Sequence, residues 1–476
     1  MRGDMNREGW TRPKIATAAV LVAGWLATVL ISWPGHLSYD SIIQLHDGRA
    51  GFYHSWHPPV MAWLLGLGDT LVSGAGLFAL FDATLFFGVL LSLLWIVPRV
   101  SWVAVAVAVE IGLLPQILLY QAIVWKDVLF ADCAVAGFVC LAHTAVQWTN
   151  ARSRFVWIVA AFVLFILATL TRQNGVIALA VGAVALGVVA SRHASKRVAL
   201  TYSAVALVSA VVIATTMSVA LSLRSDGDEG PKAQLRLLRL YDLIGAIAAQ
   251  PSLPLDRLDA DDPELERLMR SDGVRLYSPQ RNDTLVGSQA LQNELADAQP
   301  QWLAAQWKDL VLHHPWLYLK VRSAVFGWVL FTPDIVACRP VFVGIEGPAS
   351  EMSDLGIAPR KDARDLALQA YAKAFMGTPA LSHVTYAVLA IGGLIVLLRR
   401  RSQGDMAMAA MLIAALLFTA SFFVISIACD YRYLYFLDLA ALVALFYLAL
   451  DPSYLFQVVA TCSGSFWELR SDARKS

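Results

Sequence analysis

Long apolar runs recur along this chain, and they constrain its fold more than any other feature. About ten of them are roughly 20 residues long, which lets a helix cross a hydrocarbon core about 30 Å thick. Hydrophobic residues make up 58% of the chain and charged residues only 15%, which is too apolar for an ordinary soluble protein. The predicted spans are 15–33, 76–97, 101–121, 128–148, 155–171, 175–190, 198–221, 378–398, 406–428 and 433–450. The sequence therefore predicts an all-α polytopic membrane protein.

Basic residues gather in particular connections between these spans. Counting ten spans puts the following residues on one side: Arg2, Arg7, Arg12, Lys14, Arg152, Arg154, Arg192, Lys196, Arg197, Arg399, Arg400 and Arg401. Because cytoplasmic loops carry an excess of Lys and Arg, both termini are predicted to be cytoplasmic. The first span has no small-residue cleavage site before Trp33, so it is predicted to stay as an anchor in the cell (inner) membrane. The net charge of +1 gives no reason to expect nucleic acid.

Composition divides the chain into four parts. They are an N-terminal membrane module (1–221), a polar α-rich periplasmic or extracellular domain (222–376), C-terminal membrane helices (377–450) and a cytoplasmic tail (451–476). Two apolar segments, 60–72 and 317–331, are too short for a comfortable crossing and are predicted to be interfacial or re-entrant. If 317–331 did cross, the topology after it would invert. Cys338 and Cys429 could meet on the outer side, which makes a disulfide an open alternative.

Four polar motifs fall at the outer ends of the spans. The first outer loop (34–59) carries Tyr39, Asp40, Asp47, Arg49, His54 and His57, and the later motifs carry Lys126 with Asp127, Arg172 with Gln173 and Asn174, and Asp430 with Tyr431, Arg432 and Tyr433. Cations on the outer side oppose the positive-inside bias, so Lys126, Arg172 and Arg432 are predicted to bind an anionic ligand. The alternative is that they extend toward lipid headgroups or pair with their neighbouring acids.

Acidic residues supply the candidates for catalysis. A short helix capped by Ser38 would place Asp40, Gln44 and Asp47 on one face. Asp40 is then a candidate general base, or a ligand for a divalent cation such as Mg²⁺ or Mn²⁺. His54 and His57 are alternative metal ligands, although hydrogen bonds that position the loop are the preferred interpretation. Glu110 and Asp438 are candidate buried acids, and Asp438 is close enough to the outer side to join the site.

Four short motifs carry a resemblance to a known family: Tyr39-Asp40, His57-Pro58-Pro59, Lys126-Asp127 and Arg172-Gln173-Asn174-Gly175. With them the chain resembles the GT-C superfamily of membrane glycosyltransferases, which includes protein O-mannosyltransferases and aminoarabinose transferases. The resemblance implies a sugar donor on a polyprenyl phosphate, with Asp40 as base or metal ligand and Asp127 as a second acid. It also implies that Lys126, Arg172 and Arg432 hold the lipid phosphate. The remaining substrate-binding candidates are Asn174, Tyr433, His57 and Tyr39. The first outer loop has no adjacent Asp-Glu pair, since Tyr39 and Ser41 flank Asp40.

The predicted function is a glycosyltransferase of the hexosyltransferase class with its site on the outer face of the membrane. Its acceptor would be a cell-envelope glycan, lipid or protein. Cations aimed at the departing phosphate would stabilise its charge, and a carboxylate would take the proton of the acceptor hydroxyl. Tyr53, Trp56 and Tyr433 are candidates for stacking on a sugar. The alternatives are a transporter or flippase of polyprenyl-linked glycans, and a glycan polymerase or ligase with a lipid-diphosphate donor.

Overall fold

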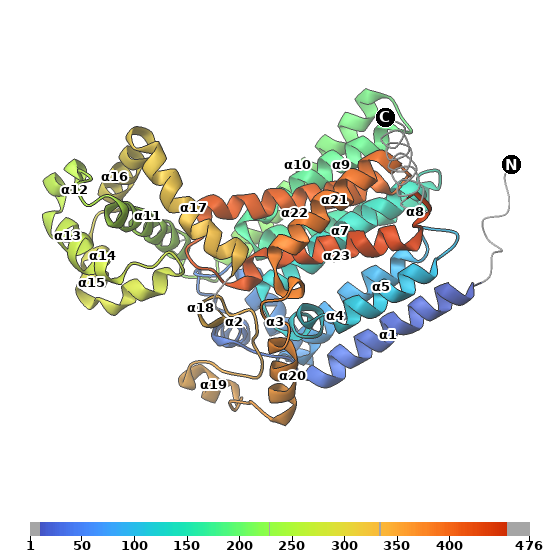
Figure 1. Ribbon diagram of the computed structural model, residues 1–476, viewed down its shortest axis with the longest axis horizontal. Helices are drawn as coiled ribbons and strands as arrows, with labels where there is room; N and C mark the ends of the chain where they lie inside the picture. The colour runs from blue at the N-terminus through green and yellow to red at the C-terminus, as the bar shows by residue number, and fades with distance from the viewer. Residues whose placement is uncertain (1–9, 228, 333–334, 455–476) are drawn as a thin grey trace, which may run out of the picture.

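A computed structural model describes residues 10–227, 229–332 and 335–454. These residues form an elongated bundle of long helices and a smaller lobe of short helices at one end of it (Figure 1). The described residues form no β-strand, and only isolated β-bridges connect some of the loops. The predicted all-α class is confirmed. The predicted tail beyond Tyr454 and the basic residues Arg2 and Arg7 lie outside the described residues.

Nine described helices are long and apolar enough to cross a membrane. They are α1 (Arg12–Ser32), α4 (Gly76–Leu93), α7 (Lys126–Val146), α8 (Ala151–Thr171), η2 with α9 (Gln173–Ser191), α10 (Lys196–Ser222), α21 (His383–Arg400), α22 (Asp405–Ile425) and η6 with α23 (Tyr431–Leu450). The chain is therefore a multi-pass membrane protein, with a helix at nine of the ten predicted spans.

The tenth predicted span, 101–121, is not one straight helix. It consists of α5 (Trp102–Leu113) and a second segment, Pro115–Ala122, which includes α6 (Pro115–Leu118), and the two are bent by 61°. Pro115 explains the break, because proline donates no backbone hydrogen bond and disfavours helical geometry in the residue before it. Glu110 lies on α5 and is exposed rather than buried, so its prediction as a buried acid is wrong.

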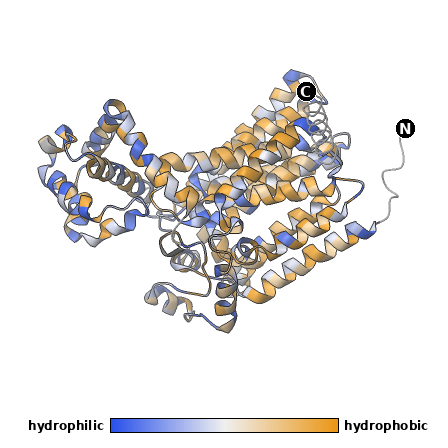
Figure 2. Ribbon diagram, in the orientation of Figure 1, coloured by the Kyte–Doolittle hydropathy of each residue, from blue (hydrophilic) through white to orange (hydrophobic). Residues whose placement is uncertain are grey.

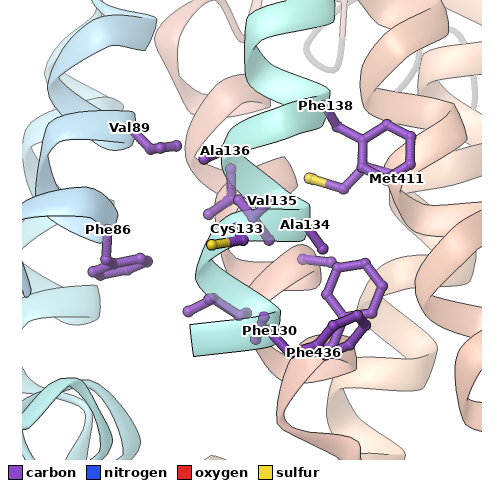
Figure 3. Close-up of a cluster of buried hydrophobic side chains, with 14 of the residues drawn as sticks. Phe86, Val89, Phe130, Cys133, Ala134, Val135, Ala136, Phe138, Met411 and Phe436 are labelled. Atoms are coloured by element: carbon purple, nitrogen blue, oxygen red, sulfur yellow. The ribbon is translucent and has the colours of Figure 1, made fainter. Parts of the chain in front are cut away.

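The central helix of the bundle is α7, whose apolar stretch is buried throughout, whereas only 22% of that of α1 and 11% of that of α10 is buried. Figure 3 shows Phe130, Cys133 and Phe138 of α7 packed among side chains of neighbouring helices, including Met411 and Phe436. Figure 2 shows that the long helices of the bundle are predominantly hydrophobic. A helix that is apolar on all sides belongs inside the bundle, so the polar start of α7 at Lys126 is held at a fixed position.

The first outer loop forms a helical hairpin of α2 (Tyr39–Ala50) and α3 (Pro59–Leu71). Ser38 and Ser41 form the N-terminal capping box of α2, as Ser38 was predicted to cap it. The two helices cross where Gly48 meets Gly66, and a side chain on Gly48 would collide with the backbone of α3. This close contact fixes how α2 and α3 cross, whereas the start of α2, next to Asp40, is held by Ser41, which donates to the carbonyl oxygen of Val124 at 2.6 Å.

The polar region predicted at 222–376 packs in two places. The first part is a lobe with its own hydrophobic core, built from α11 (Glu229–Ala249), α12 (Asp256–Asp261), α13 (Pro263–Leu268), α14 (Val274–Leu276), α15 (Gln289–Asp297), α16 (Pro300–His313) and α17 (Pro315–Phe331). The second part contains α18 (Ile335–Cys338), α19 (Ala349–Leu355) and α20 (Ala363–Lys373), and it lies beside the first outer loop (Figure 1). There the backbone of Leu37 bonds to those of Gly344 and Glu346.

A fully buried ion pair joins the lobe to the bundle. Arg322 of α17 donates to Asp242 of α11 at 2.9 Å. The same guanidinium donates to the carbonyl oxygens of Phe423 and Ser426, each at 2.8 Å, at the end of α22. The disulfide between Cys338 and Cys429, which the sequence left as an open alternative, joins α18 of the second part to the connection that follows α22. Arg322 therefore holds the lobe against the end of α22, and the disulfide holds the second part against the segment that follows it.

Replacing Arg322 by Ala is expected to destabilise the protein by about 3–5 kcal/mol, because Asp242 would keep a buried charge without its partner. Denaturant unfolding of the purified protein in detergent measures this loss. Arg267→Ala is the control, since Arg267 pairs with Glu264 on the exposed surface of α13 and should contribute less than about 1 kcal/mol. Equal losses in the two variants would contradict the structural role given to Arg322.

Candidate active site

A cavity of about 940 Å³ lies where several connections between the bundle helices meet the lobe. The first loop lines it with Ser38, Tyr39, Asp40, Trp56, His57 and Pro58, the later connections with Trp125, Lys126, Arg172, Gln173, Asn174, Asp430, Arg432 and Tyr433, and α11 with Gln234, Leu235, Leu237 and Leu238. Polar motifs that are hundreds of residues apart in the sequence therefore share one cavity. This is the convergence that the sequence predicted.

Arg432 is the centre of the charged wall of this cavity. Its guanidinium donates to Asp40 at 2.8 Å, lies 3.3 Å from the carboxylate of Asp430, and lies 3.7 Å from that of Asp127. The guanidinium carbon also stands over the ring of Trp125, 5.0 Å from its centroid. One cation thus contacts acids from three separate segments of the chain. Its position is well defined before any ligand arrives.

A chain of polar contacts leads from Lys126 through His57 to Asp40. The Lys126 ammonium donates to Nδ1 of His57 at 2.9 Å, because an ammonium group has no acceptor to offer. The His57 proton is therefore on Nε2, which lies 3.7 Å from Asp40. Burial and the Lys126 charge lower the pKa of His57 to about 4, so the imidazole is neutral at pH 7. Among the described residues, Lys126 has no carboxylate within 4 Å.

Asp40 is held in its ionised form. Burial alone would raise its pKa, but the nearby N–H of His57, the hydrogen bond from Arg432 and the positive charge of Arg432 hold the pKa well below its ordinary value. Asp40 is also about one third exposed and lines the cavity. It is therefore a carboxylate that a ligand can reach, but one whose negative charge is already satisfied by Arg432.

Arg172 occupies a second position on the charged wall. It pairs with Asp127 and stands over the rings of Phe422 and Tyr433, with its guanidinium carbon 5.3 and 5.5 Å from their centroids. The next turn is fixed by Asn174, which donates to Ser421 of α22 at 3.0 Å. Asp127 itself is buried and does not line the cavity. Its carboxylate lies behind the wall and balances the charges of Arg172 and Arg432.

Most of the predicted substrate-binding residues line the cavity: Tyr39, His57, Lys126, Arg172, Asn174, Arg432 and Tyr433. Several other candidates do not. Asp438 is buried beneath it, bonded to His383 and Tyr431 at 2.8 and 2.7 Å, so its predicted place in the site is wrong. Tyr53 is buried, and His54 pairs with Asp47 at 2.8 Å and does not line the cavity. Their hydrogen bonds shape the loop, which was the preferred interpretation for the histidine.

The structure adds two arginines that the sequence interpretation missed. Arg281 lines the cavity and pairs with Asp430 at 3.0 Å and with Asp283 at 2.9 Å. Arg339 lines it too, is exposed, and has a backbone φ of +43°, which is uncommon for a residue with a side chain. Arg339 directly follows Cys338 in the sequence, and Cys338 is bonded to Cys429, the residue before Asp430. The possible disulfide between the two cysteines was therefore the sequence signal that could have placed Arg339 near the site.

The residues around Asp40 do not form a metal site of the usual kind. No group of three or more His, Cys, Asp or Glu side chains within the described ranges is placed to hold a metal ion. The neighbours of the Asp40 carboxylate are a guanidinium and an imidazole that presents its N–H. A divalent cation would have to displace Arg432 from Asp40, so the donor set does not fit the predicted Mg²⁺ or Mn²⁺.

Comparisons by sequence find no matching family model and no matching curated protein. Among solved structures, the chain is similar to the Archaeoglobus fulgidus oligosaccharyltransferase in the apo form, with 15% sequence identity, a TM-score of 0.41, and coverage of 94% of this chain and 52% of that one. The complex of that enzyme with Zn and sulfate gives 15% identity, a TM-score of 0.42, and coverage of 92% and 49%.

The archaeal oligosaccharyltransferase AglB from Archaeoglobus fulgidus, in complex with an inhibitory peptide and a dolichol-phosphate, gives 14% identity and a TM-score of 0.39. That match covers 94% of this chain and 52% of the other. This chain spans about half the length of the solved chains to which it is similar.

The neutral His57 predicts a particular dependence of stability on pH. Its pKa is about 4 in the folded protein and about 6.5 when unfolded, so the unfolded chain binds more protons between these values. Stability from this group is complete above pH 6.5 and is lost as the pH falls toward 4, by about 2 kcal/mol between pH 7 and pH 5. Denaturant unfolding at both pH values should show that the His57→Gln variant lacks this part of the loss.

His313→Gln is the matched control, because His313 is exposed on α16 and bonds only to Asp309 of its own helix. It should keep the native difference between pH 7 and pH 5. If His57→Gln also keeps the full difference, His57 is not a buried neutral imidazole and its bond from Lys126 is wrongly assigned.

Proposed function

We propose that this chain is a GT-C-type glycosyltransferase that moves a sugar from a polyprenyl-phosphate donor to an acceptor hydroxyl on the outer face of the membrane. The observation that carries the proposal is the composition of the cavity. It brings one reachable carboxylate, Asp40, together with the cations Lys126, Arg172 and Arg432, at the outer ends of membrane helices. Such a combination suits a reaction that releases a phosphate and takes up a proton.

The cations are suited to the phosphate of the donor. Lys126 donates to the neutral His57, and no carboxylate among the described residues lies within 4 Å of it, so its charge is available to an anion. Arg172 and Arg432 are backed by Asp127, which holds both guanidinium groups toward the cavity from behind the wall. In the reaction, the bond between the sugar C1 and the phosphate oxygen breaks and leaves a phosphate dianion. Cations already in place stabilise that developing charge without having to reorganise.

Asp40 is suited to the acceptor. As the hydroxyl oxygen of the acceptor forms its bond to C1, the hydroxyl proton passes to the Asp40 carboxylate. A single displacement of this kind inverts the configuration at C1. Because Arg432 already contacts Asp40, the donor phosphate and Asp40 would compete for one guanidinium. Donor binding would then draw Arg432 toward the phosphate and leave Asp40 a stronger base.

Two features support a site on the outer side. The cavity lies next to the Cys338–Cys429 disulfide, and disulfides persist on the oxidising side of a cell membrane. The basic residues at the opposite ends of the helices, among them Arg192 and Arg400, suit a cytoplasmic location. We therefore propose a cell-envelope glycan, lipid or protein as the acceptor, with both termini in the cytoplasm and Tyr39, Trp56 and Tyr433 available to the sugars.

Turnover decides between an enzyme and a transporter. The purified protein should transfer sugar from at least one member of a panel of labelled polyprenyl-phosphate sugars, and Asp40→Asn should lower the rate by about 10²-fold or more. Asp354→Asn is the control, since Asp354 is exposed on α19 and contacts only His46. A native chain that binds the lipids but transfers sugar from none of them would favour the transporter or flippase.

Donor affinity separates the two roles considered for Asp40. If Asp40 competes with the phosphate for Arg432, Asp40→Asn should bind a short-chain polyprenyl phosphate several-fold more tightly than the native protein. Arg432→Ala should bind it roughly 10- to 100-fold more weakly, because a hydrogen bond between charged groups is lost. Titration calorimetry in EDTA and again in Mg²⁺ measures both variants. If Asp40→Asn binds the lipid phosphate more weakly than the native protein, and does so only in Mg²⁺, then Asp40 is a metal ligand and not the general base.

A further inference from the structure

The turn between α16 and α17 exposes an unusual group of apolar side chains. Leu312 is 72% exposed, Trp316 is 82% exposed and Leu319 is 39% exposed. They lie within eight consecutive residues, at the edge of a lobe whose other large apolar side chains mostly form its core. Soluble surfaces seldom leave a tryptophan and two leucines in water together, so this group is suited to a further contact. We call residues 312–320 the α16–α17 corner.

The depth of this corner relative to the bundle follows from the buried Arg322. Its guanidinium donates to the carbonyl oxygens of Phe423 and Ser426, where the membrane helix α22 ends. Trp316 precedes Arg322 by six residues of the same helix, which corresponds to about 9 Å along its axis. Since α17 is steeply inclined to α22 (Figure 1), the displacement along the bundle is smaller than that. Taking the end of α22 as the edge of the hydrocarbon core places Trp316 at the level of the lipid headgroups, which extend several Å beyond that core.

The charges around the corner suit a lipid surface as well. Lys308 and Lys320 are exposed on α16 and α17, and His313 and His314 occupy the turn between them. The acid facing this group is Asp309, which bonds to His313 at 2.8 Å. Tryptophan, leucine and lysine in such an arrangement are typical of segments that lie in a membrane interface, with the rings at headgroup level and the ammonium groups among phosphates.

We propose that the α16–α17 corner docks on the outer leaflet of the membrane in which the bundle sits, with Leu312, Trp316 and Leu319 inserted among the headgroups. The outer face of α17 continues this surface toward Phe331, which is also exposed beside the bundle. The contact is thus continuous with the surface that the membrane helices present to lipid. A separate protein would have to cover a patch lying at headgroup level, so the membrane is the occupant that the position favours.

Docking of the corner would also fix one wall of the cavity. Trp307 of α16 donates to Asp242 of α11 at 2.9 Å, and the same carboxylate holds Arg322 of α17. The first turns of α11 line the cavity with Gln234 and Leu235, and Gln234 donates to the backbone of Trp56. The corner and the cavity wall are therefore parts of one packed unit, which the membrane would hold over the site. This proposal does not depend on the reaction assigned to the cavity.

The test uses the full chain in lipid nanodiscs with a cysteine-reactive fluorophore. The background variant is Cys462→Ser, because Cys133 and Cys140 are buried and Cys338 is paired with Cys429. Trp316→Cys carries the label at the corner, and Arg267→Cys is the matched control on exposed α13, which is distant from the bundle in Figure 1. Lipids with a nitroxide near the headgroup quench fluorophores that lie in the interface.

The label at position 316 should be quenched at least twofold more strongly than the label at position 267. Equal quenching at the two positions would overturn the proposal. Because these nanodiscs contain no protein besides this chain and the scaffold around the disc, a patch reserved for a protein partner would also give an unquenched label at position 316. If Trp316→Cys does not fold, Leu319→Cys offers the same measurement one turn farther along α17.

Discussion

The geometry of the site depends on the ion pairs that the guanidinium of Arg432 forms. This group lies within hydrogen-bonding or ion-pairing distance of Asp40, Asp127 and Asp430, which come from the first outer loop, the start of α7 and the last outer connection. A buried cation at the end of a membrane bundle is costly unless acids compensate it. Moving any of the three segments would leave a charge without its partner. The mutual arrangement of these segments is therefore fixed by electrostatics as well as by packing.

Much of the fold could be predicted because a membrane imposes simple rules on sequence. A long apolar run must be a helix of a certain length, so nine of the spans follow from hydropathy alone. Topology then collects Asp40, Lys126, Arg172 and Arg432 at one end of the bundle, and the cavity contains all four. The role of Ser38 in capping α2 could also be predicted from the sequence, because serine is a favoured residue at the N-terminus of a helix.

What sequence could not supply is the direction in which individual side chains point. Lys126 and Asp127 are adjacent, yet one lines the cavity and the other lies behind its wall, since consecutive helical residues face about 100° apart. Asp438 was expected near the site and instead turns inward toward His383. Arg281 and Arg339 reach the cavity only through the packing of the lobe and the disulfide, which connect segments with no shared periodicity.

The contact between Asp40 and Arg432 joins residues separated by 392 positions in the chain. A ribosome that has synthesised the first loop must therefore complete almost the whole protein before the second partner exists. Until the connection that carries Arg432 has been made, Asp40 lacks the guanidinium that pairs with it. A chain that stops before that connection therefore has no complete site.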